Sequence, residues 1–216
     1  MSAERQISGM LRQIARQQDV IEIGPLGSRP KAAALVYAAE QYGYVYGSAH
    51  ATGYKDAQIL LRMYRDPSPE ARSREAATLT AHPRAGIGGT VPGLLPGSLK
   101  PVPEAAGDVA VLSDLIAFDL SARFVTSRGQ MVLCYLACVL VTGLLLATGP
   151  LAEAVATGGS LVLILTVALK AWPIRRERLA RRLTEAGFLP VHDEQGRQRF
   201  LRPGQQLPGH ANPFAA

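Results

Sequence analysis

The sequence predicts a mainly α-helical protein, with a small helical cytoplasmic module at its N-terminus and a two-helix transmembrane hairpin near its C-terminus. Residues 131–148 contain no charged side chain, and residues 154–172 contain only Lys170. Eighteen helical residues rise about 27 Å, which approaches the roughly 30 Å hydrocarbon core of a bilayer. A buried hairpin in a globular protein is the alternative interpretation of the same pattern.

Residues 1–81 are expected to form the N-terminal module. Apolar side chains at 7, 10, 11 and 14 have the spacing of an amphipathic helix over residues 2–18. Pro30 at a first-turn position predicts a helix through Gln41. The next expected elements are an extended stretch at 42–47, which places Tyr42, Tyr44 and Tyr46 on one face, a helix at 54–65 and a helix at 69–80.

Three further segments complete the expected organisation. Residues 82–107 are rich in Pro and Gly and predict a spacer. Asp108 is a suitable N-cap for an amphipathic juxtamembrane helix over 108–128. Beyond the hairpin, residues 173–216 are expected to form a basic cytoplasmic tail with a short helix and a β-hairpin around residues 193–196.

The positive charges predict the orientation of the hairpin. Residues 170–216 carry nine basic and four acidic side chains, whereas the turn at 149–153 carries only Glu153. Basic residues concentrate on the cytoplasmic side of membrane proteins. The expected localisation is a bacterial inner membrane, crossed twice, with both termini cytoplasmic; the bacterial source is inferred from abundant Arg, Ala and Gly.

Three groups of residues are candidate contacts. Five arginines are expected either to anchor the topology or to contact anionic lipid head groups: Arg175, Arg176, Arg178, Arg181 and Arg182. Lys170 and Trp172 are expected to anchor the membrane interface. Small residues that would permit close helix packing, within one hairpin or between copies, are Gly143, Ala147, Ala156, Gly158, Gly159 and Ser160.

No recognised catalytic, cofactor or metal motif is present in the sequence. Ser48 and His50 are neighbours, but sequence alone does not position a base beside a nucleophile. The tyrosines at 42–46 match an RNA-binding strand only in part, so nucleic acid is not an expected partner. We therefore expect a non-enzymatic, membrane-anchored adaptor or scaffold that presents its module to a protein partner. A pore-forming oligomer and a membrane-tethered enzyme are the alternatives.

Overall fold

The chain divides into two compact units. The computed structural model describes residues 3–53, 58–121, 128–148, 150–193 and 196–205, without the side chains of residues 128–134, 145, 148, 151–155, 162, 165, 168–170 and 172. Unit 1 combines Met1–Leu120 with Arg182–Ala216, and unit 2 is Ser121–Arg181.

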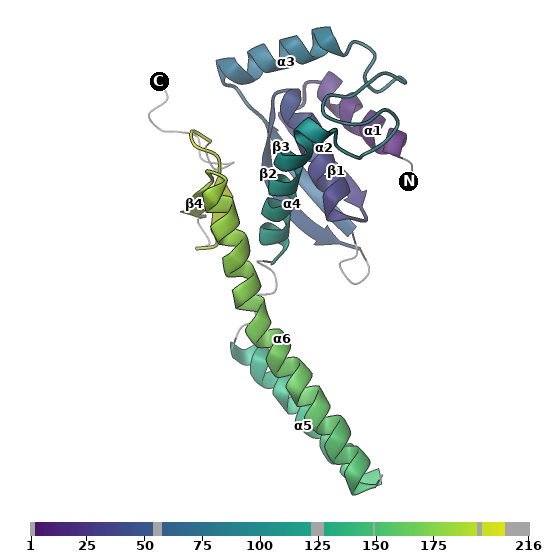
Figure 1. Ribbon diagram of the computed structural model, residues 1–216, viewed down its shortest axis with the longest axis vertical. Coiled ribbons are helices and arrows are strands. Elements are labelled where there is room, and N and C mark those ends of the chain that lie inside the picture. The colour runs from purple at the N-terminus through teal and green to yellow at the C-terminus, as the bar shows by residue number, and fades with distance from the viewer. Residues whose placement is uncertain (1–2, 54–57, 122–127, 149, 194–195, 206–216) are drawn as a thin grey trace. The chain divides into compact units, whose positions relative to one another are not determined.

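Unit 1 is built around a three-stranded antiparallel sheet with the order β1-β3-β2 (Figure 1). Its strands are β1 (Val20–Leu26), β2 (Tyr44–Thr52) and β3 (Gln58–Arg65). Its helices are α1 (Ala3–Ala15), α2 (Arg29–Gln41), α3 (Pro69–Ala81), the 3-10 helix η2 (Pro103–Ala105) and α4 (Ala106–Ser121). A second, two-stranded sheet is formed by β4 (Leu189–His192) and β5 (Gln198–Leu201).

The three-stranded sheet makes the predicted mainly helical fold class wrong. Ile59, Leu60 and Met63 predicted a helix over residues 54–65, but this stretch contains β3, and its first four residues lie outside the described ones. In β3 the side chains of Ile59, Leu61 and Met63 alternate onto the buried face. So short an apolar run is compatible with both the helical and the strand periodicity. Pairing with β1 and β2 makes this stretch a strand.

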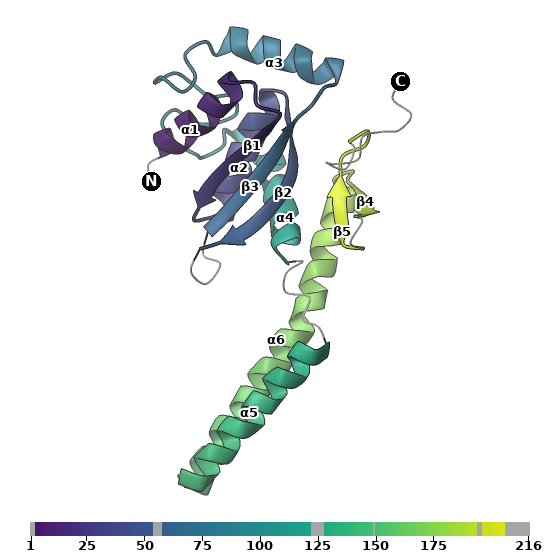
Figure 2. The ribbon, with the colours of Figure 1, turned by 180° about the vertical axis from the view of Figure 1, so that it is seen from behind.

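The core of unit 1 lies between the sheet and α2. Seven apolar residues of α2, five of them alanine, are buried, so the helix backbone can approach the sheet closely. Helix α1 adds Ile7, Met10 and Ile14 to the core. Figures 1 and 2 show α2 and α4 on the same face of the sheet. The predicted helices at 2–18, 30–41 and 69–80 are confirmed in position by α1, α2 and α3.

The segment predicted as a spacer packs on unit 1. Val91, Leu94 and Leu99 are buried, and the Ser8 hydroxyl donates a hydrogen bond of 2.9 Å to the carbonyl of Gly86. Pro and Gly keep this segment free of long regular elements, as their conformational preferences require. The three apolar side chains nevertheless hold it against the module.

Helix α4 is a core helix of unit 1. Leu112, Leu115, Ile116 and Phe118 are all buried. The Phe118 ring meets the Phe200 ring edge to face, with centroids 4.9 Å apart. The helix expected over 108–128 therefore begins at Ala106 and reaches Ser121, beyond which residues 122–127 lie outside the described chain. The predicted β-hairpin is confirmed by the pairing of β4 with β5.

Unit 2 consists of two packed helices, α5 (Arg128–Thr148) and the unit 2 part of α6 (Leu151–Glu185); we call these two helices the arm. Their seam contains Cys138, which is 7% exposed, and a hydrogen-bonding contact of 3.1 Å between the hydroxyls of Tyr135 and Thr166. Helix α6 continues through Pro173 without a break. The separate short helix expected after residue 172 is therefore part of α6.

The structure contradicts the predicted transmembrane hairpin. Among the residues that the structure describes, no helix is both long enough and apolar enough to cross a membrane. The prediction rested on the absence of charged side chains from residues 131–148 and on Lys170 as the single charge in residues 154–172. This finding overturns the transmembrane hairpin and the two-pass inner-membrane localisation with both termini cytoplasmic. The pore-forming alternative depends on the same membrane span and is overturned with it.

Candidate functional site

A pocket with a volume of about 770 Å³ lies in unit 1, between the starts of α1, α2 and α4 and the loop at residues 97–101. We call it the basic pocket. Its polar lining consists of Ser28, Lys31, Ser98, Lys100, Ser113, Asp114 and Arg182, together with Gln6. Leu99 and Val109 supply buried apolar lining. An apolar wall with a few convergent polar groups is the usual character of a small-molecule site.

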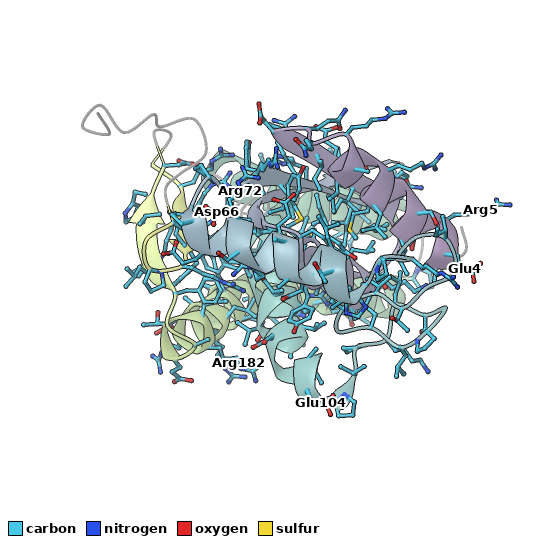
Figure 3. All side chains as sticks on the ribbon, turned by 90° about the horizontal axis from the view of Figure 1, so that it is seen from above. Glu4, Arg5, Asp66, Arg72, Glu104 and Arg182 are labelled. Carbon is cyan, nitrogen blue, oxygen red and sulfur yellow. The ribbon has the colours of Figure 1, made fainter. Side chains whose placement is uncertain are left out.

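The charges of the basic pocket are unequal. Three cationic side chains line it, against the single carboxylate of Asp114. The Arg182 guanidinium, which can be followed in Figure 3, lies 3.5 Å from that carboxylate. Neither Lys31 nor Lys100 pairs its ammonium group with any residue in the described part of the chain. Both lysines are exposed to solvent, and the pocket lining has two more cationic than anionic side chains.

The start of α2 adds one further hydrogen-bond donor, the Ser28 hydroxyl, to the same pocket. Ser28 is the N-cap, with φ −153° and ψ 144°, but its hydroxyl does not cap the helix. Pro30 occupies the first turn and has no N–H to satisfy. The Ser28 hydroxyl is thus available beside the positive end of the helix dipole.

A second polar cluster joins the C-terminal segment to β2 and α2. Arg199 donates to the carbonyl of Gly47 at 3.1 Å, and Gln205 donates to the carbonyl of Tyr46 at 2.9 Å. Arg202 forms an ion pair of 2.8 Å with Glu40. We call Arg199, Arg202 and Gln205 the C-terminal clamp. Two of its side chains, Arg199 and Gln205, satisfy carbonyls of β2, which is an edge strand of the three-stranded sheet in the described part of the chain.

Glu40 is the most perturbed carboxyl group of this cluster. Burial raises the pKa of Glu40 to about 7, although the nearby charge and hydrogen bond of Arg202 lower it. Arg74 also lowers this pKa and donates to the Glu40 backbone carbonyl at 2.9 Å, whereas Asp108 raises it. Glu40 therefore changes its charge near neutral pH, at the point where the C-terminal clamp is attached.

Ser48 and His50 are brought into contact by β2. The Ser48 Oγ and the His50 Nε2 are 3.2 Å apart, which is hydrogen-bond distance for a nucleophile and its base. Ser48 is only 8% exposed, and neither residue lines the basic pocket. The pair has suitable geometry for proton transfer but little access for a substrate.

The predicted arginine contacts lie along the last part of α6. Arg175, Arg178, Arg181 and Arg182 are exposed and Arg176 is half-buried. Arg181 forms an exposed ion pair of 2.6 Å with Glu177. The structure thus brings only Arg182 to the basic pocket, and the side chains of Lys170 and Trp172 lie outside the described residues.

The predicted packing glycines and small residues separate into two sets. A Cβ on Gly158 would lie 2.5 Å from the Thr142 side chain, so Gly158 belongs to the seam between α5 and α6. A Cβ on Gly143 or Gly159 would meet nothing within 4 Å. The exposed set also includes Ala147, Ala156 and Ser160.

The tyrosines of the possible RNA-binding strand face the core. Tyr44 and Tyr46 are 1% and 6% exposed, and the Tyr46 hydroxyl donates to Asp119 at 2.7 Å. Burial and the neighbouring Asp119 carboxylate raise the pKa of Tyr46 well above its usual value. Their rings are therefore not available to stack on bases.

Sequence reasoning missed the basic pocket. Lys31 and Lys100 are 69 positions apart, and Lys100 lies in the segment that was expected to be a spacer. The only local signal was the Pro30-Lys31 pair at a helix start, which alone does not specify a site. Lys100 follows Leu99, whose burial holds this part of the loop against unit 1.

Within the described residues, no group of three or more His, Cys, Asp or Glu side chains could hold a metal ion.

Comparisons with other proteins assign no family. No protein-family model matches the chain, and the comparisons with curated proteins and with solved structures found no match either.

Proposed function

We propose that the protein is a non-enzymatic scaffold in which two copies associate through their arms and present their α/β modules to a protein partner. The observation that carries this proposal is the exposure of large apolar side chains on unit 2. In α5 they are Leu136 (58%), Val139 (66%), Leu140 (72%) and Leu144 (61%), and in α6 they are Leu163 (64%), Ile164 (66%) and Val167 (58%). Contiguous apolar surface of this kind marks an interaction site.

The arm does not cover this surface by itself. Its seam takes up Cys138, Gly158 and the hydroxyls of Tyr135 and Thr166, which leaves the leucine and valine side chains on the outer faces. Two helices enclose only one apolar stripe. Four helices can enclose the remaining stripes as a bundle, with helices packed close to antiparallel.

A second copy is the occupant that fits this surface best. No Lys, Arg, Asp or Glu occurs between residues 131 and 152, so the contact depends on shape and apolar area instead of charge. An identical arm supplies a matching apolar surface through a two-fold axis, the commonest symmetry of protein dimers. Gly143 and Gly159 on the open faces would allow the helices to approach closely.

The proposal is tested by measuring the mass of the purified full chain by analytical ultracentrifugation. We expect twice the chain mass of 23.0 kDa. A variant with Leu136→Ser, Leu140→Ser and Leu144→Ser should sediment as a monomer. The matched control is Leu79→Ser with Ile87→Ser, which changes side chains in unit 1 that are 52% and 80% exposed, and it should remain a dimer.

Two outcomes would contradict the scaffold. A wild-type chain that is monomeric at micromolar concentration removes the self-association. A triple variant that stays dimeric places the interface elsewhere. Far-ultraviolet circular dichroism of each variant separates loss of association from loss of folding.

The contact between Ser48 and His50 supports a second candidate, a serine hydrolase. Its reaction would begin with transfer of the Ser48 proton to His50 as Ser48 Oγ attacks an ester carbonyl. A fluorophosphonate probe, which reacts with activated serines, tests it. Labelling of the wild type that is lost in Ser48→Ala would favour the hydrolase, whereas no labelling of the folded wild type would favour the scaffold.

A further inference from the structure

We propose that the basic pocket of unit 1 binds a small phosphate monoester with an apolar body. This inference goes beyond the scaffold, because the pocket is formed within unit 1 and none of its lining belongs to the arm. It would make each presented module a ligand-binding module as well.

The size of the pocket suits a small organic molecule. Its volume of about 770 Å³ lies inside the range of roughly 300–1,000 Å³ that is typical of such sites. Inorganic phosphate alone would leave most of this space unfilled. The apolar wall, which includes Leu99, Pro101 and Val109, gives an attached ring or chain a surface to cover.

The cations set the charge of the ligand. Lys31 and Lys100 line the pocket from α2 and from the loop, and neither has an ion-pair partner among the residues that the structure describes. Arg182 is held 3.5 Å from Asp114, so it can share its guanidinium between that carboxylate and a ligand. A phosphate monoester carries nearly two negative charges at neutral pH, which matches the two free lysines.

The hydroxyls favour phosphate over a simple carboxylate. Ser28, Ser98 and Ser113 all line the same pocket, and a phosphate offers three terminal oxygens to accept their hydrogen bonds. Ser28 is also the N-cap of α2, and its hydroxyl is not used to cap the helix. Lysine serves phosphate as a point charge, while serine hydroxyls provide the directional contacts.

Isothermal titration of the full chain with phenyl phosphate tests the site, with phenol and inorganic phosphate as the comparison ligands. We expect phenyl phosphate to bind more tightly than inorganic phosphate, and phenol not to bind. Lys31→Gln with Lys100→Gln should weaken phenyl phosphate binding at least tenfold. The matched control, Arg5→Gln with Arg16→Gln, removes the same charge from exposed positions on α1 and just after its end, outside the pocket, and should bind like the wild type.

The titration has three outcomes that would overturn the proposal. They are no heat from the wild type at about 10 mM phenyl phosphate, equal weakening in both double variants, and equal affinity for phenyl phosphate and inorganic phosphate. Lys31→Arg with Lys100→Arg keeps both charges, and binding by this variant alongside its loss in the glutamine variant shows that charge at these positions is required. Thermal unfolding of each variant verifies that it is folded.

Discussion

Glu40 is the residue that links the pH of the solution to the attachment of the C-terminal segment. It lies on α2, is 6% exposed, and pairs with Arg202 of the C-terminal clamp at 2.8 Å. A buried carboxylate costs free energy even when it is paired, because pairing replaces only part of its hydration. The raised pKa of Glu40, about 7, is the expression of that cost.

The stability of unit 1 should therefore fall as the pH rises from about 4.5 to about 7. The folded chain binds the Glu40 proton more tightly than the unfolded chain does, so stability is greatest below the unfolded pKa and is lost as the pH passes the folded value. The loss should be about 3 kcal/mol. Urea unfolding at several pH values, compared with Glu40→Gln, measures it, and an equally steep pH dependence in the variant would refute the assignment.

Tyr42 offers a second test at a single residue. Its hydroxyl is buried and has no hydrogen-bond partner within the described chain, and burial raises the pKa of Tyr42. An unsatisfied buried polar group costs roughly 1–3 kcal/mol. Tyr42→Phe should thus raise the free energy of unfolding by about 1 kcal/mol, as measured by urea denaturation. A clear loss of stability would mean that the hydroxyl has a partner after all.

Among the elements of unit 1, both edge strands of the three-stranded sheet have backbone groups that are hydrogen-bonded by side chains. On β1, the Gln13 side chain donates to the Glu22 carbonyl at 2.9 Å and accepts from the Glu22 N–H at 3.1 Å. On β2, Arg199 and Gln205 occupy the carbonyls of Gly47 and Tyr46. A partner that adds a strand needs free edge groups, and these side chains occupy such groups at Glu22, Tyr46 and Gly47.

The bulge in β2 gives an element-scale prediction. The register of β2 against β3 shifts between Tyr46 and Ser48, and a Cβ on Gly47 would lie 2.2 Å from the Tyr64 ring and 2.9 Å from a β3 carbonyl. Gly47→Ala should therefore destabilise unit 1 by about 2 kcal/mol through overpacking. Gly27→Ala is the control, because its Cβ meets nothing within 4 Å. Equal melting temperatures for the two variants would show that the bulge tolerates a side chain.

Local sequence signals located the helices better than the sheet. Amphipathic spacing and Pro at the first turn predicted α1, α2 and α3 because these signals lie within each element. The strand β3 was taken for a helix because its identity depends on two neighbours in the sheet. The basic pocket was not predicted for the same reason, since Lys31 and Lys100 line one pocket only when the loop is packed.

At the scale of the whole molecule, α6 belongs to both units. It begins in the arm at Leu151 and ends in unit 1 at Glu185, with Leu183 fully buried there. One continuous helix therefore connects the apolar surface of the arm to the α/β module. Under the proposed scaffold, association of two arms fixes the number of presented modules without altering the core of either module.

If a second copy covers the arm, photo-crosslinking in living cells should join two chains through it. A photoreactive amino acid at position 140 replaces a leucine that is 72% exposed on α5, and the same group at position 79 replaces one that is 52% exposed on α3. We predict a product of twice the chain mass from position 140 and none from position 79. No product from position 140, the same products from both positions, or only products with other proteins would contradict the claim.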